Sequence, residues 1–247
     1  MITPNYNLDK IKFATDEPTW EKAVRLYQEG KITKFSETPS GFSAVVLGTS
    51  PYRVIVSAKK YDQGDCECYL GQNDTLCKHM VAVAIYAVKK GRALTDEEKN
   101  QHNQVVCSGK AGTLSWTELA EVSKNISLAL CYIKAYSGPS RNWFAYQDSL
   151  IEGCNRLASI ISTLPANEQT AGLIIDLLLR LDKKLTHGGV DDSDGTVGDF
   201  IIDTVKVLEE FVKIDQSCMK ALVVLKDKNT CFDWEEPLIQ LMDEEDK

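Results

Sequence analysis

Alternating apolar and polar positions mark the first third of the chain. Tyr52, Val54 and Val56 alternate with Arg53, Ile55 and Ser57, a mainly core-facing set beside a more mixed outer set. Two similar runs come before this one, and turns that contain proline, serine or glycine separate the three. This arrangement predicts a small antiparallel sheet with one buried face. The predicted strands are residues 31–37, 41–48 and 51–59.

Helical periodicity surrounds the sheet and then fills the remaining chain. Pro18 and Gly30 bracket residues 20–29, which predicts a helix with proline in its first turn and glycine past its end. An almost entirely apolar helix is predicted at residues 78–90. From Ser115 onward, where Glu118 completes a capping-box pattern, apolar residues recur every three or four positions. The predicted helices are residues 116–136, 150–164, 174–185 and 201–212, with shorter ones near 217–227 and 234–244.

The patterns together predict an α+β fold: a small antiparallel sheet plus helix around a metal site, followed by an all-α helical array. We place a first domain at residues 1–94 and an acidic helical domain at 115–247. The connector, residues 95–114, has little apolar periodicity but can hold a short helix after Thr95. No repeated signature is visible in the helical domain, so both a bundle and a solenoid remain open.

Charge divides the chain in the same place. Residues 1–110 carry 15 basic and 13 acidic side chains, whereas residues 111–247 carry 13 basic and 23 acidic ones. The second region is therefore a poor surface for phosphate backbones and a better one for protein partners. The longest apolar runs are too short to cross a bilayer, and the first twenty residues lack the apolar core of a secretory signal. We expect a cytoplasmic protein in a reducing compartment, with no membrane partner.

Four potential metal ligands are clustered within fourteen residues: Cys66, Cys68, Cys77 and His79. Three thiolates and one imidazole are the ligand set of a closed tetrahedral zinc site, which leaves no open position for an activated water. The first two cysteines can converge if they lie in a tight turn, which Gly64 would favour. The last two ligands open the apolar helix, where the positive end of the helix dipole faces the thiolates. The sequence predicts one structural Zn²⁺.

The C-x-C-x8-C-x-H pattern follows the strand PYRVIV and leads into an apolar helix, and in this it resembles the SWIM zinc finger over about residues 20–94. The resemblance implies that Cys66, Cys68, Cys77 and His79 are the zinc ligands. It also implies a domain that binds nucleic acid or protein. The helical region is similar to the C-terminal region of some bacterial proteins of this kind, and that likeness carries no known chemistry.

No catalytic motif is found, so we name no catalytic residue and expect a non-enzymatic protein. The favoured hypothesis is a protein–protein adaptor, because the acidic helical region makes up more than half of the chain. The alternative is DNA or other nucleic-acid binding through the zinc domain, with Arg53, Lys59 and Lys60 as candidate contacts and aromatic residues nearby. The five remaining cysteines are interpreted as small core residues, and the acidic loop 191–195 as a helix cap rather than a calcium site.

Overall fold

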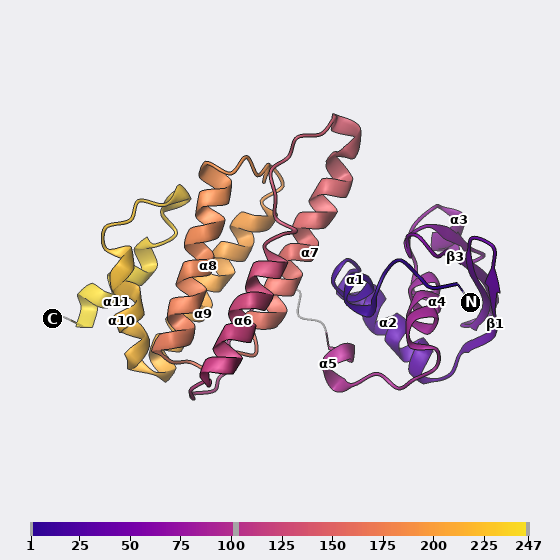
Figure 1. The fold of residues 1–247 in the computed structure, drawn as a ribbon, viewed down its shortest axis with the longest axis horizontal. Coiled ribbons are helices and arrows are strands. Elements are labelled where there is room, and N and C mark those ends of the chain that lie inside the picture. The colour runs from indigo at the N-terminus through magenta and orange to yellow at the C-terminus, as the bar shows by residue number, and fades with distance from the viewer. Residues whose placement is uncertain (1, 101–103, 246–247) are drawn as a thin grey trace. The chain divides into compact units, whose positions relative to one another are not determined.

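The computed structural model describes residues 2–100 and 104–245 and divides the chain into two compact units, Met1–Gln101 and His102–Lys247 (Figure 1). Each unit has its own cluster of buried apolar side chains. In the part of the chain that is described, no helix is both long and apolar enough to cross a membrane. The first unit combines a sheet with helices and the second is helical, which confirms the predicted fold class.

A four-stranded antiparallel sheet forms one layer of the first unit, with the strands in sequence order. The strands are β1 (Ile32–Thr38), β2 (Gly41–Leu47), β3 (Pro51–Ser57) and β4 (Gly64–Cys66). In β3, Val54 and Val56 are fully buried while Ile55 is exposed, as the alternation predicts. The three-residue strand β4 is too short to be detected by periodicity.

Helix α4 (Lys78–Lys89) covers the buried face of this sheet and contacts β2 and β3. This helix is buried on all sides over most of its length, since residues 79–85 are all buried. Its other side packs against α2 (Glu17–Gln28), whose Trp20 is fully buried, and against α1 (Leu8–Phe13). Two short helices complete the unit, α3 (Tyr69–Gln72) and α5 (Asp96–Lys99).

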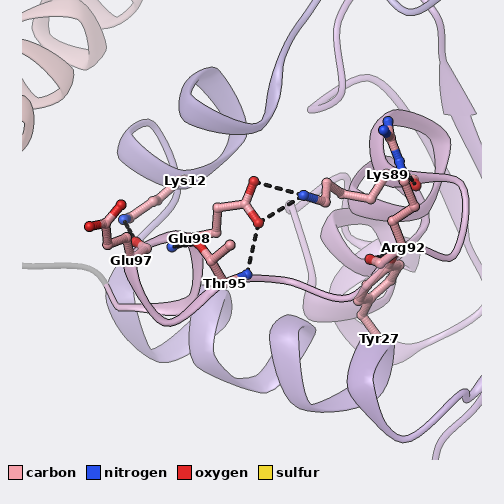
Figure 2. A network of polar contacts seen from close by, with 7 residues as sticks. All are labelled: Lys12, Tyr27, Lys89, Arg92, Thr95, Glu97 and Glu98. Carbon is pink, nitrogen blue, oxygen red and sulfur yellow. Dashed lines mark hydrogen bonds and ion pairs between the residues drawn. The ribbon is translucent and has the colours of Figure 1, made fainter.

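Polar contacts hold the segment after α4 against the helices of the same unit (Figure 2). Lys89 donates to both carboxylate oxygens of Glu98 at 2.7 Å, and Glu98 also accepts from the backbone of Thr95 in a capping box. Lys12, which is buried, donates its ammonium to the carbonyl of Glu97 at 2.6 Å. The indole N–H of Trp20 donates to the carbonyl of Lys99 at 2.8 Å. Residues 95–99 therefore belong to the packing of the first unit.

The second unit is a helical bundle. Its long helices are α6 (Trp116–Ala129), α7 (Trp143–Ile161), α8 (Glu168–Thr186) and α9 (Thr196–Ile214). Helix α6 contacts α7, α7 contacts α9, α9 contacts α8 and α8 contacts α6, so the four close around one core. A closed set of contacts is a bundle rather than a solenoid. The smaller elements are η1 (Ser140–Asn142), η2 (Gln216–Cys218), α10 (Met219–Leu222), η3 (Val223–Leu225), η4 (Cys231–Asp233) and α11 (Glu236–Glu245).

The prediction of a continuous helix over residues 116–136 is wrong, because α6 ends at Ala129. Beyond this point, backbone groups form hydrogen bonds with α8 and the loop after it instead of continuing the helix. Lys184 donates to the carbonyl of Ile133 at 2.6 Å, and the backbone N–H of Tyr136 donates to the carbonyl of Gly189 at 3.0 Å. Ile133 is fully buried by this turn. Tertiary packing thus overrides a helical pattern that local sequence supports.

The acidic loop before α9 caps that helix, as the sequence analysis predicts. The two carboxylate oxygens of Asp192 accept from the backbone N–H groups of Val197 and Gly198, both at 2.8 Å. Burial raises the pKa of Asp192, while these two N–H groups act in the opposite direction. The carboxylate satisfies two helical donors that have no partner within the helix.

Candidate metal centre

The two cysteines of the C-x-C pair sit at a change from strand to helix. Cys66 is the last residue of β4 and Cys68 is the N-cap of α3. The backbone turns between them, as the spacing requires if both sulfurs are to face one point. Gly64 is placed differently from our expectation: it lies in β4 rather than in the turn.

The other two candidate ligands lie at the start of α4. Cys77 is the N-cap and His79 is in the first turn. One ligand atom from each of the four residues lies within 4.8 Å of all the others. The His79 Nδ1 is 3.7 Å from the Cys66 Sγ and 3.9 Å from the Cys77 Sγ.

These separations fit a tetrahedral zinc ion. Bond lengths of about 2.3 Å to sulfur and 2.0–2.1 Å to nitrogen place neighbouring ligand atoms roughly 3.5–3.8 Å apart. All four residues are between 1% and 8% exposed, so the site is shielded from water. Three thiolates and one imidazole fill the coordination of zinc, which when bound cross-links β4, α3 and α4.

Hydrogen bonding between two of these cysteines favours the thiolate form of Cys77 and raises the pKa of its partner Cys66. The Cys66 side chain donates toward the sulfur of Cys77, and the His79 ring and the backbone N–H of Met80 add to the effect, so the pKa of Cys77 falls to about 4 although burial opposes the change. The sulfur of Cys68 accepts from the backbone N–H of Gly71 at 3.4 Å. The backbone N–H groups of Met80 and Gly71 can also serve zinc-bound thiolates, whereas Cys66 and His79 would bind the metal instead of donating.

Glycine is required at position 71. A Cβ there would lie 2.3 Å from the Cys66 carbonyl oxygen and 2.5 Å from the Cys66 Cβ, closer than real atoms approach. The missing side chain lets α3 lie directly against the end of β4. No local sequence pattern marks this residue, since its role depends on a tertiary contact.

The imidazole of His79 is held by packing on its far side. Its Nε2 is buried and has no hydrogen-bond partner among the residues that the structure describes. The ring of Tyr52 lies against it, with ring centroids 4.6 Å apart and an interplanar angle of 31°. Tyr52 is itself tied through its hydroxyl to Thr49 at 2.8 Å. A Cβ on Gly48 would lie 3.1 Å from the Nε2, so a glycine gives the ring its space.

The three candidate nucleic-acid contacts do not come together. Arg53 is exposed on β3 and lines a hollow that also contains Asp65, Glu67 and Asp74. At roughly 3.3 Å per residue, Arg53 is about 13 Å from the end of the strand at Ser57. Lys59 and Lys60 follow beyond that end, where both are exposed.

The remaining cysteines are distributed over the helical unit. Cys154 and Cys218 are buried in its core, and burial raises the pKa of each thiol. Cys107 and Cys231 are half-buried. Cys131 is exposed, which corrects its interpretation as a core residue. It falls just past the end of α6, where the chain turns and Leu130 and Ile133 on either side are buried in the core instead.

Comparison with known proteins adds one finding to this geometry. Residues 52–87 match the family model of the SWIM zinc finger, a span that contains all four clustered ligands. No curated protein and no solved structure matches the chain. The ligand set, its burial and the family match agree: the chain carries a SWIM zinc finger, in which Cys66, Cys68, Cys77 and His79 hold one structural zinc ion.

Proposed function

We propose that this protein is a non-enzymatic protein–protein adaptor, in which the zinc finger and the helical bundle each present a surface to protein partners. Zinc binding and the broad class of interaction domain follow from the finger. The choice of protein over nucleic acid rests on how aromatic and charged side chains are used in the finger.

The observation that carries the proposal is that aromatic residues near the finger's lysines are used in its own packing. Phe35 stacks with Phe42 and also contacts Tyr86, with ring centroids 5.8 Å and 4.6 Å away. Tyr52 lies on the zinc ligand His79, and Tyr61 is buried. Binding of single-stranded nucleic acid relies on exposed rings on which bases can stack. Tyr61 is buried and Phe35 and Tyr52 are only partly exposed, so these three rings offer little surface for stacking.

Surface charge supports the same choice. Residues 61–76, which make up most of the zinc-binding segment, contain four acidic side chains and neither lysine nor arginine. All four are exposed: Asp62, Asp65, Glu67 and Asp74. A zinc ion with three thiolates adds a net charge of about −1 beneath them. A surface of this sign repels a phosphate backbone.

The non-enzymatic part of the proposal rests on the zinc ligands. Four protein ligands leave zinc no position for a substrate or an activated water, which a catalytic zinc needs. A turnover activity abolished by a substitution away from the zinc site would contradict it. A reducing, intracellular setting is included because thiolate ligands must stay unoxidised to bind metal.

The adaptor hypothesis is tested by titrating labelled single- and double-stranded DNA and RNA with the zinc-loaded protein at low and physiological salt. We expect weak binding at most, lost at physiological salt. The comparison variant is Lys59→Glu/Lys60→Glu, and Lys213→Glu/Lys226→Glu in the helical unit is the matched charge control. Tight binding at physiological salt that only the first double variant removes would overturn the proposal in favour of nucleic acid.

A further inference from the structure

A hollow of about 400 Å³ lies on the outer face of the sheet, next to the zinc site. Arg53 and Ile55 of β3 form part of it, on the opposite side of the strand from the buried Val54 and Val56. Residues from β4, the following turn, α3 and the loop after α3 supply the rest. The lining residues are Arg53, Ile55, Asp65, Cys66, Glu67, Gly71, Gln72 and Asp74.

Three carboxylates converge on this hollow from different segments: Asp65 from β4, Glu67 from the turn, and Asp74 from the loop after α3. Arg53 is the opposing charge among the lining residues, so their net charge is negative. Cys66, a zinc ligand, also lines the hollow. When zinc is bound, the net negative charge of the zinc–thiolate centre would add to that of the carboxylates.

Apolar surface accompanies this charge. Ile55 is 44% exposed within the hollow. Helix α3, which contributes Gly71 and Gln72 to the lining, also exposes Leu70 at 44% and Tyr69 at 81%. Exposed aliphatic and aromatic side chains beside oriented charges are typical of a site that binds a protein segment.

We propose that this hollow binds an extended segment of a partner protein in which apolar residues alternate with arginine or lysine. Guanidinium groups would pair with Asp65 and Asp74, and an apolar side chain would cover Ile55. The inference depends on the proposed protein-interaction function and specifies the chemistry of the finger's partner.

The test measures binding of fluorescein-labelled six-residue peptides of alternating leucine and arginine to the full-length, zinc-loaded protein by fluorescence anisotropy. A peptide with glutamate in place of arginine is the charge control for the ligand. The protein variant is Asp65→Asn/Asp74→Asn, which removes two charges with little change of shape. Its matched control is Glu21→Gln/Glu29→Gln, which removes two charges from exposed residues at and just after α2 of the same unit.

We expect the arginine peptide to bind and the glutamate peptide not to bind. Each exposed ion pair contributes up to about a fivefold change in affinity, so Asp65→Asn/Asp74→Asn should weaken binding by about tenfold while the α2 control changes it little. Equal weakening by the two double variants would mean attraction to net charge alone and would overturn the assignment. Failure of the wild-type protein to bind the arginine peptide would also overturn it.

Either failure concerns the hollow alone, because the helical bundle could still bind protein partners. The adaptor function as a whole fails by a different result, namely nucleic-acid binding through Lys59 and Lys60. The two hypotheses are therefore tested by separate measurements on the same protein preparation.

Discussion

The stacking of Tyr52 on His79 gives a prediction about zinc affinity. A zinc-bound histidine usually donates its second ring N–H to a carboxylate, a carbonyl or water, which fixes the orientation of the ring. Here the Nε2 of His79 is buried without such a partner among the described residues, and the Tyr52 ring lies 4.6 Å away. We infer that packing against Tyr52 performs the orienting role, so its removal should weaken zinc binding.

The expected size of the effect follows from the contact. An aromatic pair of this geometry contributes about 0.5–1.5 kcal/mol beyond the area it buries, which corresponds to a twofold to roughly thirteenfold change in the dissociation constant for zinc. Tyr52→Leu should weaken binding by that factor. Tyr52→Phe should retain nearly all of it, because it keeps the ring and loses only the exposed contact with Thr49.

Gly48→Ala tests the same support from the other side. Its Cβ would lie 3.1 Å from both the His79 Nε2 and the Tyr52 ring, so one of them must shift. The assay is competition for zinc with a chromophoric chelator, with the visible spectrum of the cobalt-substituted protein as a second readout of ligand geometry. Tyr69→Leu is the matched control, because that ring is 81% exposed. Tyr52→Leu protein that holds zinc as tightly as the wild type, with an unchanged cobalt spectrum, would refute the reasoning.

Three further predictions concern the stability of the two units. Chelation of zinc should unfold the first unit and leave the helical bundle folded, because the two units have separate cores. Hydrogen exchange should then show lost protection only before residue 101, and lost protection in both units would contradict this prediction. Burial lowers the pKa of Lys12, so between that lowered pKa and 10.5 the folded state binds fewer protons than the unfolded state. The free energy of unfolding should therefore rise with pH across this window. Urea unfolding at neutral and alkaline pH should show this rise in the wild type and a smaller one in Lys12→Met. Asp192→Ala should lower the unfolding free energy of the bundle by about 1–2 kcal/mol, since two capping hydrogen bonds are lost, whereas Asp227→Ala at an exposed position should leave thermal denaturation unchanged.

Local patterns predict much of this protein. Turn residues delimit β1, β2 and β3, and alternation marks the buried face of β3. The capping-box pattern locates the start of α6, a short helix is expected after Thr95 where α5 lies, and the spacing of four ligands predicts the zinc site. Each of these signals lies within a few residues of chain, where side-chain type and backbone conformation are directly coupled.

The features that sequence analysis missed depend on contacts between distant residues. The end of α6 is set by Lys184 and Gly189, more than fifty residues later. Gly71 and the pairing of Tyr52 with His79 acquire their roles only when β3, α3 and α4 are packed together. Likewise, Arg53 looks like part of a basic patch in the sequence, but the fold places it among carboxylates. A linear pattern carries no information about such neighbours.

The contacts around α5 determine where the finger can be separated from the rest of the protein. Trp20 is fully buried and its indole N–H donates to the carbonyl of Lys99. A fragment ending at residue 94 would keep every zinc ligand and the whole sheet, yet it would leave this N–H and the Lys12 ammonium without their acceptors. An unsatisfied buried donor costs about 1–3 kcal/mol, a large share of the stability of a small domain. Anyone expressing the finger alone, for spectroscopy or for screening ligands, should therefore retain the chain through residue 100.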